Sequence, residues 1–203
     1  MPVAQWLEQH PHKMLVASSS LVRRTIQTRV NTMSEVFHIG DLHFGHKNIH
    51  RFRPNVGEIL VANESEHREA VIELWNKTVS KRDVVWLHGD VLFEASLLHQ
   101  LGRLNGNKNL ILGNHDIQLR DWVYFNKVVG FEKYKRTWLS HAPIHPAELR
   151  GKLNIHGHVH YATITAPEGA VDERYFNCSI ENINGRPIAH NVIMENYNRQ
   201  IGG

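Results

Sequence analysis

The sequence has a single cysteine and no long apolar run. Among its 203 residues only Cys178 carries a thiol, so no disulfide can form within the chain, which fits a reducing compartment. No stretch of 18 or more apolar residues occurs, so no membrane-spanning helix is expected. The apolar share of 41% and the charged share of 21% are ordinary for a globular protein. We therefore expect a cytoplasmic protein with one folded domain and no membrane partner.

The main part of the chain also lacks an excess of charge of either sign. The whole chain has 23 basic and 20 acidic residues. Four of the basic residues and one of the acidic residues lie within residues 1–32, which leaves 19 of each from Met33 onward. A neutral body gives no electrostatic argument for nucleic-acid binding, although it does not exclude a nucleic acid as substrate.

Residues 1–32 differ in character from the rest of the chain. They show no clear helical or strand period, and we expect a disordered N-terminal extension followed by one domain over residues 33–203. Their Arg- and Ser-rich, acid-poor composition is one feature of an organellar transit peptide. Alternatively, the string VAQWLEQHPHKMLVASSSLVRRT resembles a translated tRNA gene, in which case Met33 would be the natural start.

From Ser34 onward, strand-like and helix-like segments alternate. The first half has predicted strands at 35–40, 83–88 and 109–112, and predicted helices at 64–79 and 94–104. Asn63 or Ser65 is the expected N-cap of the first helix. This β-α-β-α-β order indicates parallel strands joined by crossover helices. The second half predicts another, largely antiparallel sheet, from short β-like segments at 134–140, 152–156, 160–165, 171–178 and 186–194.

Five short motifs follow the ends of predicted strands. In chain order they are Asp41-Leu42-His43, Gly89-Asp90, Gly113-Asn114-His115-Asp116, His141 and Gly157-His158-Val159-His160. They supply carboxylate, carboxamide and imidazole groups, a set that suits two divalent metal ions sharing one carboxylate. Because loops at the carboxyl ends of strands converge from a rigid scaffold, we expect the motifs to meet at one sheet edge.

The spacing within two motifs supports the same site. Asp-x-His and His-x-His place their polar residues at i and i+2, and in extended backbone these side chains point the same way. Glycines beside the motifs would let the backbone approach the cluster closely. Carboxylate oxygen together with imidazole nitrogen favours Mn²⁺, Fe²⁺, Zn²⁺ or Ni²⁺ over Ca²⁺, and we expect two such ions with Mn²⁺ as first choice.

In this order, DLH, GD, GNHD, SHAP and GHVH resemble the motifs of the calcineurin-like metallophosphoesterase superfamily. The strings HIGDLHFGHKNI and FNCSIENING are similar to the small stand-alone phosphoesterases of bacteria and phages, and the resemblance covers residues 34–194. It implies an α/β fold, a two-sheet β-sandwich flanked by helices in α/β/β/α layers. It also implies a location in the cytoplasm of a bacterium or of a phage-infected host cell.

The resemblance implies seven metal ligands and a proton donor. Asp90 would bridge two metal ions. The remaining ligands would be Asp41, His43 and His160 for the first ion and Asn114, His141 and His158 for the second. A hydroxide bridging the ions would attack phosphorus, because two cations lower the pKa of bound water toward neutrality. His115 would protonate the leaving oxygen, and Asp116 would orient and stabilise His115.

Several of these residues have simpler explanations when taken singly. His141 alone would be a capping or core histidine, and Asn114 alone a turn residue. His115 could itself be a ligand. Asp116 could be the N-cap of a helix starting near Ile117, in addition to its other role.

Two residues after the first motif are candidates for substrate contacts. We expect His46 and Arg51 to contact the substrate phosphate. The alternative is that both lie in a loop exposed to solvent and contact no substrate. Cys178 alternates with apolar residues and is expected in the core.

Departures from family patterns narrow the reaction. Protein Ser/Thr phosphatases of this superfamily carry GDxxDRG followed by GNHE, whereas this chain reads GDVLFEA and ends its third motif with Asp116. A protein phosphatase is therefore not expected. We predict hydrolysis of a small or flexible phosphodiester, with a small-molecule phosphomonoesterase as the alternative and a non-catalytic metal-binding scaffold as a third possibility. The physiological substrate and the oligomeric state stay open.

Overall fold

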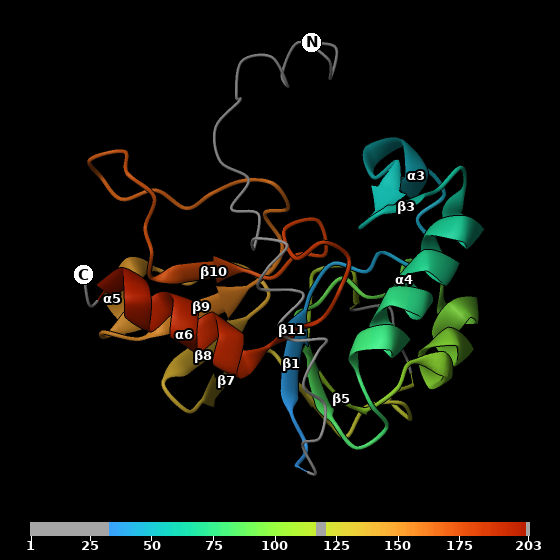
Figure 1. The fold of residues 1–203 in the computed structure, drawn as a ribbon, viewed down its shortest axis with the longest axis horizontal. Helices are drawn as coiled ribbons and strands as arrows, with labels where there is room; N and C mark the ends of the chain where they lie inside the picture. The colour runs from blue at the N-terminus through green and yellow to red at the C-terminus, as the bar shows by residue number, and fades with distance from the viewer. Residues whose placement is uncertain (1–32, 117–120, 202–203) are drawn as a thin grey trace. The chain divides into compact units, whose positions relative to one another are not determined.

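The computed structural model describes residues 33–116 and 121–201, and within them two main sheets lie among helices (Figure 1). The first sheet has the strand order β11-β1-β4-β5-β6. Its members are β1 (Val36–Ile39), β4 (Val84–Leu87), β5 (Asn107–Ile111), β6 (Lys127–Val129) and β11 (Ile188–Ala189). The pairs from β1 to β6 are parallel, and β11 pairs antiparallel with β1. The parallel arrangement predicted for the first half is confirmed, while the prediction for residues 1–32 falls outside the described residues.

The second sheet is mostly parallel, so the antiparallel prediction for it is wrong. Its order is β10-β9-β8-β7, with β7 (Phe131–Tyr134), β8 (Thr137–Ser140), β9 (Leu153–His156) and β10 (Tyr175–Asn177). The pair β7–β8 is an antiparallel hairpin, but β8–β9 and β9–β10 are parallel. The physical reason lies in the connections. Residues 141–152 and 157–174 are long enough to cross over, whereas antiparallel neighbours need only a tight turn.

Two further segments of the second half differ from the prediction. Residues 160–165 form no strand and make only an isolated bridge between Thr165 and Val171. The strand expected over 186–194 ends after β11, and helix α6 (His190–Ile201) follows at once. The buried residues His190, Ile193 and Tyr197 are spaced three and four apart, which is a helical rather than a strand period.

Helix α4 (Glu64–Thr78) agrees closely with its predicted range. Its N-cap is Asn63, whose side chain accepts a hydrogen bond from the backbone N–H of Glu66. The Glu66 carboxylate in turn accepts from the backbone N–H of Ala62. The first bond satisfies an amide group that the first helical turn leaves without a partner, and the second satisfies an amide just before the N-cap, so the predicted start of the helix is confirmed.

The helix predicted over 94–104 is a 3₁₀ helix, η1 (Ala95–Arg103). Leu98, Leu101 and Leu104 are three residues apart, and a 3₁₀ helix with three residues per turn lines them up on one side. Leu101 and Leu104 are buried in the core, and Leu98 packs against it. The described residues also contain α3 (Ile49–Phe52), the hairpin of β2 (Asn55–Val56) with β3 (Ile59–Leu60), and α5 (Pro146–Leu149).

Alternating side chains divide the hydrophobic core into two clusters around the first sheet. On β4, Val85 and Leu87 face the cluster shared with α4 and η1, while Trp86 faces the cluster shared with the second sheet. On that second side, Leu139 and Ile155 of the second sheet pack together with residues of α6. The expected two-sheet β-sandwich flanked by helices is therefore confirmed. Within the described residues, no helix combines the length and apolarity needed to cross a membrane.

Candidate metal centre

Each predicted ligand motif lies just beyond the carboxyl end of a strand. Asp41 follows β1, Asp90 follows β4 and Asn114 follows β5, all in the first sheet. His141 follows β8, and the His158–His160 segment follows β9, both in the second sheet. The site is therefore built where two sheets end side by side, whereas the motif pattern predicted a single sheet edge.

The backbone at the site is strained in a consistent way. Five predicted ligands have φ between 50° and 71°, in the left-handed region: Asp41, His43, Asp90, His158 and His160. Non-glycine residues rarely adopt this conformation, which costs about 1–3 kcal/mol each and concentrates at functional sites. Asp41 and His43 do reach the same cluster, whereas His158 and His160 reach different ones, and the extended backbone given as the reason is wrong for both pairs. Local left-handed turns aim them instead.

Two glycines allow the loops to come this close. A Cβ at Gly157 would lie 2.4 Å from Asp41 Oδ2, and a Cβ at Gly113 would lie 2.3 Å from the backbone nitrogen of Asp90. The Asp41 carboxylate is buried and accepts a hydrogen bond from the backbone N–H of His158 at 3.0 Å, and the Asp90 nitrogen belongs to the backbone, so neither neighbour can readily move away. Any other residue at these positions would push the carboxylates out of the cluster.

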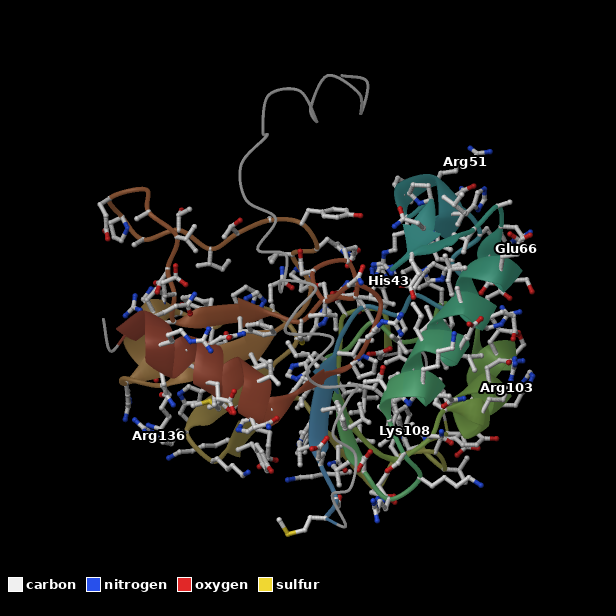
Figure 2. The ribbon with its side chains drawn as sticks, in the orientation of Figure 1. His43, Arg51, Glu66, Arg103, Lys108 and Arg136 are labelled. Carbon is white, nitrogen blue, oxygen red and sulfur yellow. The ribbon has the colours of Figure 1, made fainter. Side chains whose placement is uncertain are left out.

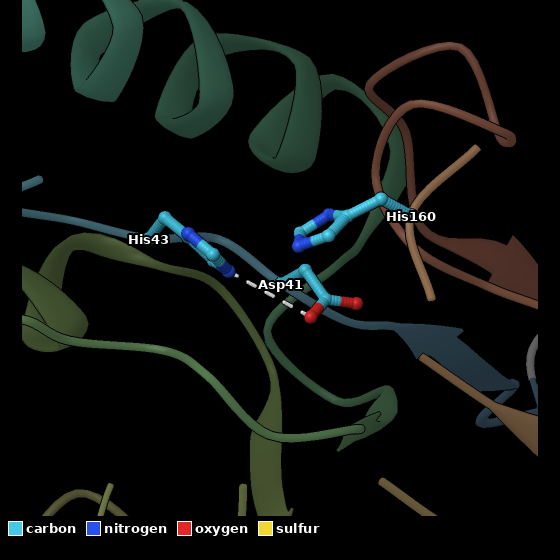
Figure 3. Close-up of side chains that lie close together, drawn as sticks. All are labelled: Asp41, His43 and His160. Atoms are coloured by element: carbon cyan, nitrogen blue, oxygen red, sulfur yellow. Dashed lines mark ion pairs between the residues drawn. The ribbon is translucent and has the colours of Figure 1, made fainter. Parts of the chain in front are cut away.

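The first cluster consists of Asp41, His43 and His160 (Figure 3). One potential ligand atom from each lies within 4.8 Å of the others, and His43 Nε2 is 3.7 Å from Asp41 Oδ1. Asp41 is fully buried. Burial alone would raise the pKa of its carboxyl, but the neighbouring His43 and Ser179 side chains outweigh burial and lower the pKa to about 2. The carboxylate is therefore ionised at neutral pH.

The second cluster consists of Asp90, His141 and His158, whose ligand atoms likewise lie within 4.8 Å of one another. Asn114 joins them, with its Oδ1 2.9 Å from His141 Nε2. The ring of His141 is fixed from behind, because its Nδ1 lies 2.8 Å from the carbonyl oxygen of His88 and donates to it. Its Nε2 is thereby left to face the cluster.

Asp90 connects the two clusters. Its Oδ2 lies 3.8 Å from His43 Nε2 in the first cluster and 3.5 Å from His141 Nε2 in the second. The same oxygen lies 3.9 Å from His115 Nε2. One carboxylate oxygen is thus the common neighbour of both ligand sets and of the predicted proton donor.

The donor atoms fit divalent cations. Asp41 Oδ1 and His43 Nε2 are buried and make no hydrogen bond within the described residues, although buried polar atoms are nearly always hydrogen-bonded. In the second cluster, His141 Nε2 and Asn114 Oδ1 lie 2.9 Å apart. The only ring proton of neutral His141 is on Nδ1, where it is donated to the carbonyl oxygen of His88. Both atoms therefore present lone pairs that could bind a cation. Atoms that bind one ion at about 2.1 Å lie roughly 3–4 Å from one another, as these do.

His115 lies at the rim of the cluster rather than inside it. Its side chain is 42% exposed, which leaves it accessible to a substrate. Phe93 stacks on its ring with centroids 4.4 Å apart and an interplanar angle of 29°. Phe93 also contacts the rings of His43 and His46. This aromatic support was not predicted, because a phenylalanine four residues after Gly89 carries no chemical signal of its own.

The side chain of Asp116 is buried and binds backbone N–H groups. Its carboxylate is buried and accepts hydrogen bonds from the backbone N–H groups of Asp90, Val91 and Gly113, at 2.8, 2.9 and 2.9 Å. Burial raises the pKa of Asp116 above its ordinary value, against the lowering effect of these amides. The proposed orientation of His115 by Asp116 stays a prediction, and the helix start expected near residue 117 falls outside the described residues.

We expect Asp116→Ala to destabilise the protein by about 2–4 kcal/mol, because it leaves three buried backbone N–H groups without acceptors. The measurement is the free energy of unfolding in urea without added metal. Asp121→Ala is the matched control, since Asp121 accepts one backbone N–H from Val123 in an exposed turn and its loss should cost less than about 0.5 kcal/mol. Equal effects of the two substitutions would contradict this role.

The two predicted substrate contacts lie in different surroundings. His46 is near the site, with its ring centroid 6.1 Å from that of His43. Its buried Nδ1 makes no hydrogen bond to any described residue. Arg51, by contrast, is exposed on α3, and Figure 2 shows it projecting outward, away from His43. A contact of His46 with substrate remains compatible with the structure, whereas Arg51 would have to turn inward.

The structure places a different arginine against the cluster. Arg53 is buried, 4% exposed, and its Nη1 donates to the backbone carbonyl of Asp41 at 2.6 Å. It forms an ion pair with Glu181, which also lies 2.9 Å from Nδ1 of His160. This Glu181 contact is the main cause of the raised pKa of His160. The sequence held no signal for the pair, since its two members are 128 positions apart.

Comparison with known proteins bears on the family and the fold of the chain. The calcineurin-like phosphoesterase family model matches residues 34–188. The gene 66 protein of Mycobacterium phage L5 is 30% identical over 167 residues, covering 63% of this chain and 78% of its own. An uncharacterized protein of Methanocaldococcus jannaschii is 28% identical over 176 residues, covering 81% of this chain and 92% of its own.

A solved structure shares the fold. The crystal structure of a protein of unknown function from Aquifex aeolicus superposes with a TM-score of 0.61 and 23% sequence identity. The match covers 80% of this chain and 99% of that chain. With all five motifs gathered at one place and a family model matched over most of the described residues, the chain belongs to the calcineurin-like phosphoesterase family.

Proposed function

We propose that the protein is a phosphodiesterase that depends on two divalent metal ions. The observation that carries the proposal is the position of Asp90, whose Oδ2 lies within 3.8 Å of ligand atoms in both clusters. A carboxylate so placed suits two ions held a few ångströms apart, the arrangement used for in-line displacement at phosphorus. The ligands are Asp90 together with Asp41, His43, His160, Asn114, His141 and His158.

The protein groups have distinct tasks in this proposal. Bound metal ions would supply Lewis acidity and a water molecule of lowered pKa as the source of the nucleophile. The carboxylates of Asp41 and Asp90 supply negative charge that attracts the metal ions to the site. His88, through its carbonyl oxygen, holds the ring of His141 with Nε2 toward the cluster. His115, at the accessible rim, donates a proton to the leaving oxygen.

One charged group of the protein bears on the choice between a diester and a monoester. A phosphodiester carries one negative charge at neutral pH, whereas a phosphomonoester carries close to two. Arg53, which contacts the first cluster, already has its charge paired with Glu181. It therefore offers little to a second negative charge on the substrate. Mn²⁺ is the proposed metal, because mixed imidazole and carboxylate ligands suit it and it supports hydrolysis without redox chemistry.

The ratio of two hydrolysis rates tests this choice. With Mn²⁺ bound, kcat/KM for bis-p-nitrophenyl phosphate should exceed that for p-nitrophenyl phosphate by about tenfold or more, a difference of ~1.4 kcal/mol in transition-state stabilisation. The same protein stripped of metal by a chelator is the control and should hydrolyse neither. The reverse ranking would favour the monoesterase. Full metal loading with no hydrolysis of either compound would favour a non-catalytic scaffold.

A further inference from the structure

We infer that the buried Arg53–Glu181 ion pair is a positioning element for the first cluster and selectively sets the metal affinity of that half of the centre. This inference rests on the proposed dinuclear site. It concerns residues that lie behind the ligands and do not themselves belong to either cluster. The argument depends on what the pair holds, how completely it is buried, and what holds the second cluster instead.

The Arg53 guanidinium lies against two members of the first cluster, Asp41 and His160, and against Glu181 behind them. Its Nη1 donates to the carbonyl oxygen of Asp41 at 2.6 Å, its Nη2 lies 3.2 Å from Nδ1 of His160, and its Nε donates to Glu181 Oε1 at 2.7 Å. The planar fork of donors makes this geometry specific to arginine. Because Asp41 has a left-handed φ of 59°, a fixed hydrogen bond to its carbonyl helps to hold a conformation that is otherwise unfavourable.

Glu181 fixes the ring of His160 from behind. Its Oε1 lies 2.9 Å from His160 Nδ1, and it also accepts from Arg53. An imidazole whose Nδ1–H is held by a carboxylate presents Nε2 as the ligand atom and becomes more basic. The side chain of Glu181 is only 4% exposed, so the contact is shielded from water and from screening by salt.

The segment that carries Glu181 holds the main chain of His160 as well. The side-chain amides of Asn177 and Asn182 both donate to the carbonyl oxygen of His160, at 2.7 and 2.6 Å. The same segment joins the end of β1, where the backbone N–H of Gly40 donates to the carbonyl of Cys178 at 2.9 Å. Residues 177–182 thus tie the Asp41 loop and the His160 loop together, and the ion pair is the charged part of this connection.

Apart from the backbone N–H of His158, which donates to Asp41 Oδ2 at 3.0 Å, the second cluster is supported by other groups. His141 is oriented by the carbonyl of His88, and the Asp90 loop is held by the Asp116 carboxylate. The hydrogen bonds and ion pairs described for Arg53 and Glu181 reach Asp41 and His160 and none of these residues. Weakening the pair should therefore affect one metal position and leave the other largely intact.

The test is a titration of the metal-free full chain with Mn²⁺. Binding is measured by calorimetry and by the electron paramagnetic resonance signal of unbound Mn²⁺. The wild-type protein should bind two Mn²⁺ per chain. Glu181→Gln should weaken one site by about 10–100-fold and leave the other within about threefold, because the variant loses the charge that orients His160 and leaves the Arg53 guanidinium unbalanced beside the cluster.

Two further variants complete the test, one as a control and one as an independent way to weaken the ion pair. Glu58→Gln is the matched control, since Glu58 pairs with Arg186 but is 59% exposed, and it should leave both affinities unchanged. Arg53→Lys keeps the positive charge but lacks the fork of donors, so it should also weaken one site, by about tenfold or more. It serves as the readout if Glu181→Gln fails to fold, which circular dichroism of the metal-free variant reports.

Three outcomes would overturn the inference. The first is a Glu181→Gln or Arg53→Lys protein that folds and binds two Mn²⁺ with wild-type affinities. The second is equal weakening of both sites in a folded variant. The third is unchanged metal affinity with a raised KM alone, which would make Arg53 a substrate-binding residue. A wild-type chain that binds no Mn²⁺ would instead overturn the proposed function, and it is recognised before any variant is prepared.

Discussion

Asp90→Ala should lower phosphodiester hydrolysis by about 10³-fold or more. The carboxylate is the common neighbour of both clusters, so its loss should remove one ligand from each proposed metal position at once. Metal ions stabilise the transition state at phosphorus by several kcal/mol, and each 1.36 kcal/mol corresponds to a factor of ten in rate. The measurements are the metal content of the purified variant and kcat/KM for bis-p-nitrophenyl phosphate under saturating Mn²⁺.

The control for this substitution is an aspartate away from the site. Asp121→Ala removes an exposed carboxylate that accepts one backbone hydrogen bond and should keep both metal content and rate. Asp90→Asn adds a second comparison, because it keeps the shape of the side chain but removes the charge. An Asp90→Ala protein with two bound metals and near-wild-type activity would exclude the shared-carboxylate arrangement.

His115→Ala should lower kcat for a diester with an alkoxide leaving group by about 10²–10⁴-fold while the protein keeps its two metals, the range typical for loss of a general acid. The ring is accessible at the rim of the cluster and is held by stacking on Phe93. It lies 3.9 Å from Asp90 Oδ2, so it is close to the reaction centre without belonging to either ligand cluster. Stopped-time assays paired with metal analysis of the same samples provide the measurement.

The leaving group offers a second readout of the same role. A proton donor matters most for a poor leaving group, so the defect of His115→Ala should shrink when the leaving group is a good one such as p-nitrophenolate, compared with an alkoxide. His99→Ala, at an exposed histidine of η1, is the matched control and should behave as wild type. If His115→Ala loses metal in proportion to activity, His115 is a ligand and its assignment as the acid is wrong.

Prediction from the sequence worked well where chemistry or periodicity was local. Helix α4 and its Asn63 cap follow from a hydrophobic face and a capping side chain within a few residues of each other. The parallel order of β1, β4 and β5 follows from strands separated by helices. Both signals are contained in short windows of sequence, which is why they could be interpreted without tertiary information.

Prediction failed where pairing between distant segments decides the outcome. The direction of β8, β9 and β10 depends on how their connections cross the sheet, and short apolar runs give no information on direction. The segment after β11 contains an apolar run compatible with either strand or helix, and its packing against the second core cluster selects a helix. Left-handed backbone at Asp41 and His160 was likewise not predicted, because the enrichment of Asp and His in this region is too weak to identify single positions.

The sequence by itself determined the kind of chemistry, because metal-centred hydrolysis needs particular donor atoms and the five motifs supply them in a recognisable order. Only the tertiary structure decided how the donors are shared. It brought the ends of two sheets together, set Asp90 between the clusters, and placed Glu181 behind His160. Arg53 and Glu181 are separated by 128 positions, and such a contact forms only when the whole chain has folded.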